Sequence, residues 1–176
     1  EVAATFATQP LPSGPRVLVL TTAGGWGVVT ADAISQSSDL VLAPLPSDLK
    51  QSIDELVPPR WSKNNPIDLA GGETRDTIPE LLSVASSHPE IDSIIQLGLG
   101  IQGNTANLIR SGNFYPDHGL ERIVDIHERQ EKRYAEASVE VSLTSGKPVL
   151  VASELAIAQP NNPMVLTIRE SKRLCY

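Results

Sequence analysis

The chain has 176 residues, and 14 basic against 21 acidic side chains give it a formal net charge of −7. An acidic chain is repelled by phosphate backbones, which disfavours a nucleic-acid-binding protein. A single cysteine excludes a disulfide framework and a cysteine-based zinc site, and no run of apolar residues is long enough to suggest a membrane span. We therefore expect a cytoplasmic protein that contacts neither nucleic acid nor membrane.

The first half of the chain predicts strands that alternate with helices. Residues 16–21 are mainly apolar without alternation, which is typical of a strand covered on both faces in a parallel sheet. A glycine-rich turn follows, after which Trp26, Val29 and Ala33 have the spacing of one helical face. The further elements expected in this half are a strand over 39–43, a helix from Ser47, a long loop over 58–72, a helix over 74–87 and a strand over 91–98.

One long predicted helix, from about Gly119 to Ser145, dominates the second half. It would be about 40 Å long, more than the span of a small domain of about 30 Å, so one end should project. Residues 99–118 are rich in glycine and asparagine, which predicts a surface excursion. After the helix we expect a strand over 147–152 and weaker strands over 164–168 and 173–176.

The long helix also carries an apolar stripe on one side. Part of this stripe is expected to meet another subunit or domain, and a homodimer through residues 119–145 is one form of that contact. The stripe comprises Leu120, Ile123, Val124, His127, Tyr134, Ala137 and Val141.

Alternating strands and helices are typical of an open parallel α/β sheet with helices on both faces. In such folds, ligands bind at the carboxyl ends of the strands. We assign residues 13–176 to one domain of this class and expect residues 1–12 to be the end of a preceding helix or a linker. Both ends are abrupt, so we expect a domain cut from a longer chain.

The stretch Ala23-Gly-Gly-Trp-Gly27 is the most informative candidate site. Glycines after a buried strand let the backbone turn tightly and present its N–H groups, and the following helix adds the positive end of its dipole. Together these features favour an anion such as phosphate. The stretch matches neither G-x-G-x-x-G nor a P-loop, so a turn that only packs the helix on the strand is the alternative.

A second glycine turn, Gly71-Gly72, follows Asn65 and Asp68 and immediately precedes a predicted helix. Each of the two turns is near a strand end, so both are candidates for the same edge of the sheet. An ordinary turn before a helix is the alternative interpretation of the second one.

The chain offers no convincing nucleophile or metal-ligand cluster. We expect His88 to be solvated in a turn, His118 to cap a helix or lie on the surface, and His127 to be a hydrogen-bonded histidine of the core or an interface. Cys175 falls in a predicted strand and is expected to be buried rather than reactive. We therefore predict no catalytic residue and no metal site in this chain.

Several motifs, taken in order, resemble one family, the NDP-forming acyl-CoA synthetases, which include acetate–CoA ligases and are relatives of succinyl-CoA synthetase. The resemblance rests on residues 10–33, on Leu56-Val-Pro-Pro59 and on Asn65-Pro-Ile-Asp-Leu69. It extends to Gly146-Lys-Pro-Val-Leu150, whereas residues 99–145 match less well. The resemblance implies a flavodoxin-like ligase domain, which in that family follows the CoA-binding and histidine-carrying domains.

The resemblance also implies an activity that joins a carboxylic acid to CoA with ATP or GTP and Mg. In that family a mobile phosphohistidine carries the phosphoryl group to a distant ATP-grasp domain, and two helix N-termini hold it. The helix opening at Trp26, where family members commonly have proline, matches one of them. The backbone N–H groups that the resemblance assigns to the phosphate belong to Ala23, Gly24, Gly25, Trp26 and Gly27.

The histidine, the CoA pocket and the nucleotide site would then lie in partner domains, a CoA-binding and an ATP-grasp domain of the same protein. The present chain alone is expected to be inactive and to bind no cofactor. The alternative function is a non-catalytic flavodoxin-like docking or regulatory module, which the rest of the gene would distinguish. A flavin-binding flavodoxin fits less well, because the chain lacks a Ser/Thr-rich phosphate loop and suitably placed aromatic residues.

Overall fold

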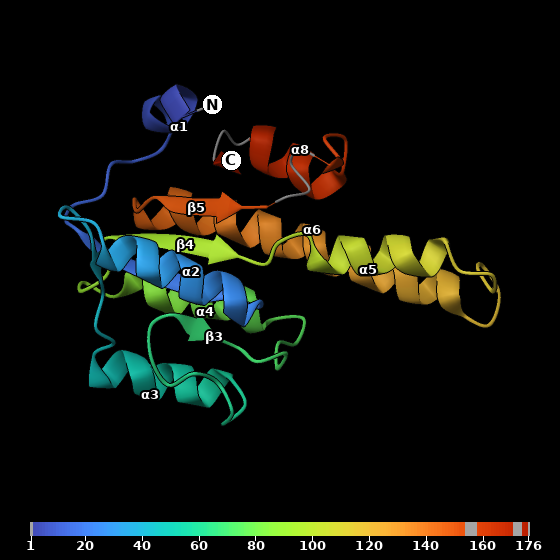
Figure 1. Cartoon of the computed structure of the whole chain (residues 1–176), viewed down its shortest axis with the longest axis horizontal. Helices are drawn as coiled ribbons and strands as arrows, with labels where there is room; N and C mark the ends of the chain where they lie inside the picture. Colours follow the sequence, from blue (N-terminus) through green and yellow to red (C-terminus); the bar gives the residue numbers. More distant parts are fainter. Residues whose placement is uncertain (1, 154–157, 171–173, 176) are drawn as a thin grey trace.

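The computed structural model describes residues 2–153, 158–170 and 174–175. Strands and helices alternate through most of this length (Figure 1). The strands are β1 (Arg16–Thr21), β2 (Val41–Leu42), β3 (Ile67–Asp68), β4 (Ser93–Leu97), β5 (Val149–Ala152) and β6 (Leu174–Cys175). The helices are α1 (Val2–Thr8), α2 (Gly24–Ser35), α3 (Ser47–Leu56), α4 (Thr77–Ser87), α5 (Ile101–Arg110), α6 (Leu120–Ser145) and α8 (Pro163–Glu170).

The strands form one parallel sheet in the order β2-β1-β4-β5-β6. Strand β3 adds to β1 as well: β2 pairs with the first two residues of β1, and β3 pairs with Leu20 and Thr21 at its end. The predicted open parallel α/β sheet of flavodoxin-like type is therefore confirmed. The long loop predicted over 58–72 needs one correction, since it contains β3.

Helices cover both faces of the sheet. The larger core lies between one face and residues of α3, α4, α6 and α8, with Leu18, Leu20 and Ile94 at its centre. On the other face a smaller apolar cluster joins β1 and β4 to α2 through Ile34. No described helix combines the length and apolar character needed to cross a membrane.

Helix α2 turns a different face to the sheet from the one predicted. Trp26, Val29 and Ala33 are exposed, and the buried positions are Gly27 and Ile34. A Cβ atom on Gly27 would lie 2.9 Å from the methyl group of Thr21 and 3.4 Å from the Pro66 ring. The small size of Gly27, and not the position of the large apolar side chains, therefore determines which face of α2 packs on the sheet.

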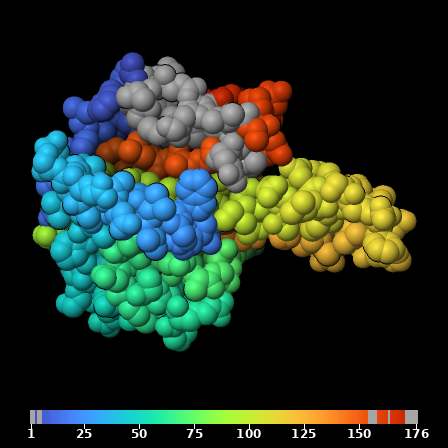
Figure 2. Space-filling model, viewed as in Figure 1, coloured from blue at the N-terminus to red at the C-terminus, as the bar shows by residue number. Residues whose placement is uncertain are grey.

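The surface excursion predicted over 99–118 is largely a helix, α5. This helix runs beside the first half of α6, and the two project from the domain as an arm (residues 101–128; Figures 1 and 2). Gly103 and Ala106 are buried in the arm, one helical turn apart. Small residues at this spacing let two helices approach closely, so the spacing indicates a packed helix. The glycine content of the segment instead favoured the prediction of a surface excursion. The projection expected for the long helix is observed.

The arm is fixed at its base by Glu131 of α6, which is only 2% exposed. Its carboxylate accepts hydrogen bonds from the backbone N–H groups of Gly100 (2.6 Å) and Gly103 (3.0 Å) at the start of α5. Burial raises the pKa of this carboxyl, and the backbone donors oppose that rise. A negative charge at a helix N-terminus is also favoured by the helix dipole.

Two weaker predictions near the end of the chain have different outcomes. The segment predicted as a strand over 164–168 is helix α8. Asn162 caps it, because its Oδ1 accepts a hydrogen bond from Met164 N (3.0 Å), and Pro163 occupies the first helical position. A short apolar run does not distinguish strand from helix by itself. Of the segment 173–176, residues 174–175 form β6.

Candidate anion-binding site

The candidate site lies where the chain leaves β1 and enters α2. The helix begins at Gly24, two residues before the predicted opening at Trp26, and Ala23 is its N-cap without a side-chain cap. Three of the five predicted N–H donors already have partners. Ala23 N donates to the Thr21 hydroxyl (2.9 Å), and the N–H groups of Trp26 and Gly27 both donate to the Ala23 carbonyl (3.0 and 3.3 Å).

The two remaining donors are the N–H groups of Gly24 and Gly25, which have no hydrogen-bond partner among the described residues. Gly25 is exposed, and no acidic residue occupies the first turn of the helix. Unpaired N–H groups at the positive end of a helix dipole are suited to bind an anion. The arrangement therefore supplies two donors, not five.

Gly25 is not needed for the backbone conformation. Its φ is not among the positive values, and a Cβ atom placed on it would meet nothing within 4 Å. Gly24 differs, because its Cβ would lie 2.4 Å from Oδ2 of Asp68. A side chain at Gly24 would therefore require the Asp68 carboxylate to move, whereas one at Gly25 would not.

Asp68 connects the two predicted glycine turns. It ends β3, its Oδ1 accepts a hydrogen bond from Ala70 N (2.9 Å), and its Oδ2 lies against Gly24. The structure thus places Asp68, which precedes the second turn, beside the first turn at the carboxyl ends of β1 and β3. The carboxylate also puts a negative charge next to the two free donors, where it repels an incoming anion.

Gly71 and Gly72 do not present a helix N-terminus. Helix α4 starts only at Thr77, so the prediction that this pair immediately precedes a helix is wrong. Gly72 N donates to the Leu69 carbonyl (2.9 Å), and Arg60 donates to the carbonyls of Ala70 and Gly71 (3.2 and 3.1 Å). These hydrogen bonds hold the second turn in place.

Asn65 lies inside the sheet, not at its edge. It is 5% exposed, and its Oδ1 accepts a hydrogen bond from Val19 N (2.9 Å). Its Nδ2 donates to the carbonyls of Val17 and Ala43 (both 2.9 Å). Both polar atoms of the Asn65 side chain form hydrogen bonds with backbone atoms. Asn65 therefore stabilises the fold around the site and is not a ligand-binding group.

None of the three histidines, all of which are described, lies at the start of α2. His88 is not solvated as predicted: its side chain is 13% exposed and its Nε2 is 3.3 Å from a carboxylate oxygen of Asp48. His118 lies on the surface against Phe114, and His127 forms a hydrogen bond with Gln102. The side chain of Cys175 lies outside the described ones.

A family model described as the Ligase-CoA domain matches residues 17–105 of the chain. Two curated ADP-forming ligases are similar to it. The 4-hydroxybutyrate–CoA ligase (ADP-forming) of Nitrosopumilus maritimus (strain SCM1) is 31% identical over 97 residues, which are 55% of this chain and 14% of that protein. The acetate–CoA ligase (ADP-forming) II subunit alpha of Pyrococcus furiosus is 33% identical over 90 residues, which are 51% and 20% of the two chains.

Solved structures agree with this fold over nearly the whole chain. The protein PH0766 from Pyrococcus horikoshii OT3 superposes with a TM-score of 0.67 at 20% identity, over 99% of this chain and 34% of that one. The dinucleotide-forming acetyl-coenzyme A synthetase 1 of Ca. Korarchaeum cryptofilum gives 0.66 at 21% identity, over 98% and 32%. The matched stretches of the chain cover only 14% and 20% of the length of the two curated relatives.

Proposed function

Since this chain belongs to the Ligase-CoA domain family, we propose that it forms one domain of an ADP-forming acid–CoA ligase and holds a phosphoryl group at the start of α2. The observation that carries the proposal is the pair of unpaired N–H groups on Gly24 and Gly25. The similarity of the chain to two ADP-forming acid–CoA ligases supports the chemical class.

The phosphoryl group in this proposal is carried by a histidine of another domain of the same protein. CoA, ATP and Mg would bind in the CoA-binding and ATP-grasp domains. The role of the present chain is electrostatic: two N–H groups and the helix dipole stabilise the negative charge while the phosphohistidine rests at the turn. Binding of free phosphate should be weak, because a tethered ligand reaches a much higher effective concentration.

The exposed apolar residues beside this turn support contact with a partner domain. Trp26, Val28 and Val29 are 59%, 61% and 67% exposed and project from the start of α2. A cluster of large apolar side chains next to a candidate site is typical of a surface that another domain covers. The arm supports a second contact, between two copies of the chain, through Phe114 (69% exposed) and Ile123 (40% exposed).

Asp68 favours a second candidate, a non-catalytic docking module with the same fold. Its carboxylate lies against Gly24 and opposes the binding of any anion there. In this alternative the turn only packs α2 on the sheet, and the apolar face of α2 is the functional surface.

A phosphate titration followed by amide NMR tests the first function. In low-salt buffer we expect shifts centred on Gly24 and Gly25, with a dissociation constant in the millimolar range, or about 4 kcal/mol of binding free energy. A sodium chloride titration to the same ionic strength is the control for screening. Gly25→Ala should bind equally well, because it keeps the N–H and its Cβ meets nothing. Shifts located elsewhere, or none at high millimolar phosphate, would leave only the docking function.

A further inference from the structure

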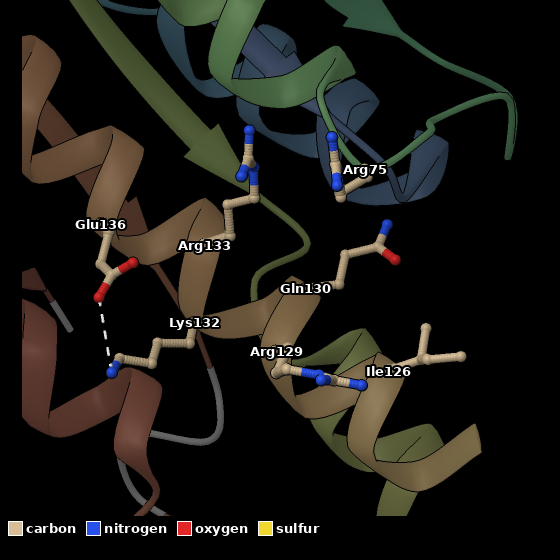
Figure 3. Close-up of a pocket in the computed structure, with 7 residues that line it drawn as sticks. All are labelled: Arg75, Ile126, Arg129, Gln130, Lys132, Arg133 and Glu136. Atoms are coloured by element: carbon tan, nitrogen blue, oxygen red, sulfur yellow. Dashed lines mark ion pairs between the residues drawn. The ribbon is translucent and has the colours of Figure 1, made fainter. Parts of the chain in front are cut away.

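A hollow of about 560 Å³ lies between α6 and the loop that leads into α4. Four of its lining side chains are cationic: Arg75 comes from the loop, and Arg129, Lys132 and Arg133 come from α6 (Figure 3). It lies on the sheet face that α4 and α6 cover, whereas α2 covers the opposite face. The hollow is therefore separate from the candidate site at α2.

One carboxylate orients two of these arginines. Oδ2 of Asp76 is 2.9 Å from Nη2 of Arg75, and Oδ1 of Asp76 accepts a hydrogen bond from Nη2 of Arg133. Arg129 is held separately, because its Nε donates to the Asp125 carbonyl (3.1 Å). Each guanidinium has five N–H donors, so these contacts fix their positions and leave donors for a ligand.

Gln130, one of the lining residues, belongs to a chain of hydrogen bonds. Nε2 of Gln130 donates to the Tyr134 hydroxyl, which in turn donates to the Thr74 carbonyl (3.0 Å). Tyr134 is 4% exposed, so the chain rests on the packed core. The amide of Gln130 is thereby held beside Arg75 in the hollow (Figure 3).

The charge in the hollow is opposite to that of the chain. The described lining residues include four cations and one anion, Glu136, which is 3.6 Å from Lys132. Behind this lining, Asp76 pairs with two of the arginines, and Glu73 and Glu131 lie near Tyr134. The lining itself therefore carries an excess of positive charge, although the chain as a whole carries a net charge of −7. A positive hollow in an acidic protein attracts small anions selectively to one place.

We propose that this hollow binds the phosphate chain of a small phosphorylated molecule. Planar guanidinium groups bind phosphate oxygens in pairs, and three arginines line this hollow, with Arg75 and Arg133 on one side and Arg129 on the other (Figure 3). The volume falls within the usual range for small-molecule sites. Among the described lining residues Ile126 is the only apolar one, so this part of the hollow lacks the buried aromatic or aliphatic anchors on which a protein partner depends.

Isothermal titration calorimetry of the whole chain with pyrophosphate at low salt tests this site. Arg129→Gln and Arg133→Gln should each weaken binding at least fivefold. Arg122→Gln removes the same charge from the same helix outside the hollow, and it should change affinity less than twofold. Thermal unfolding of each variant, compared with the unmodified chain, checks that the fold is retained.

Further ligands identify the source of the phosphate group. Equal affinity for pyrophosphate and ADP assigns the site to the phosphate chain alone, and tighter binding of ADP assigns it to a nucleotide; adenosine should not bind in either case. Loss of pyrophosphate binding in Arg122→Gln, absence of binding to the unmodified chain, or tighter binding of an acidic peptide would overturn the proposal. NMR shifts at Gly24 and Gly25 with none at residues 126–133 would overturn it while leaving the α2 site intact.

Discussion

Replacing Asn65 with alanine should lower the free energy of unfolding by about 3 kcal/mol or more, since each buried polar group left unpaired costs about 1–3 kcal/mol. The Asn65 side chain forms three hydrogen bonds with backbone atoms of Val17, Val19 and Ala43. It fills the gap along β1 where neither β2 nor β3 pairs with it, because each of those strands has only two residues. Alanine would leave the Val19 N–H and the Ala43 carbonyl without these partners inside the sheet, whereas the Val17 carbonyl keeps its hydrogen bond from Ala43 N (2.8 Å).

Urea denaturation followed by circular dichroism measures this loss. Asn64→Ala is the matched control, because Asn64 is the adjacent residue, is exposed, and has no side-chain hydrogen bond among those of the described residues. The control should change stability by less than about 0.5 kcal/mol. Equal effects of the two substitutions would show that Asn65 does not join the strands.

Replacing Asp92 with asparagine should cost on the order of 2 kcal/mol at neutral pH, as expected for hydrogen bonds to a buried charged group. Asp92 is 1% exposed, and its two oxygens accept hydrogen bonds from Nε and Nη2 of Arg16 (2.8 and 2.9 Å). The Ser13 hydroxyl and the backbone N–H of Arg16 also donate to it. Asparagine removes the charge and replaces one acceptor with a donor that faces other donors.

Glu90→Gln is the control, because Glu90 pairs with the same arginine at 2.8 Å but is 57% exposed. An exposed ion pair contributes little, so this substitution should cost less than about 1 kcal/mol. Denaturation of the unmodified chain and both variants under identical conditions gives the comparison. A larger loss for Glu90→Gln than for Asp92→Asn would contradict the role given to the buried pair.

The effect of Asp92 should also depend on pH. The hydrogen bond from the Arg16 guanidinium, opposed by burial, holds the pKa of Asp92 well below its usual range. A carboxyl whose pKa is lower in the folded than in the unfolded chain stabilises the fold above the unfolded value of about 4, and this stabilisation is lost as the pH falls. The difference between the unmodified chain and Asp92→Asn should therefore shrink below about pH 4.

The fold could be predicted from the sequence where apolar pattern and chain order agree. The run at 16–21 and the long helix from Gly119 are such cases, and both lie where they were expected. The apolar pattern alone did not predict the helix packing where a small residue determines it. Gly27 determines the buried face of α2, and Gly103 allows α5 to pack against α6, yet glycine content alone suggests a turn or an irregular segment.

The candidate site was predictable in its location but not in its detail. The turn after β1 and the strand end at Asp68 are visible as motifs, and parallel strands bring their carboxyl ends to one edge. The Thr21 hydroxyl and the Ala23 carbonyl determine which N–H groups remain unpaired. These hydrogen bonds cannot be predicted from the spacing of residues in the sequence. The hollow beside α6 combines residues more than 50 positions apart, so it follows only from tertiary packing.

The most direct test of phosphate binding at α2 is an NMR phosphate titration of Asp68→Asn beside the unmodified chain at low salt. Asparagine keeps the Oδ1 acceptor for the Ala70 N–H and removes the negative charge next to Gly24. If the anion is held by the Gly24 and Gly25 N–H groups, its dissociation constant should fall about threefold or more, because a like charge within a few ångströms has been removed. An unchanged or larger dissociation constant, or shifts that do not centre on Gly24 and Gly25, would contradict phosphate binding at this helix.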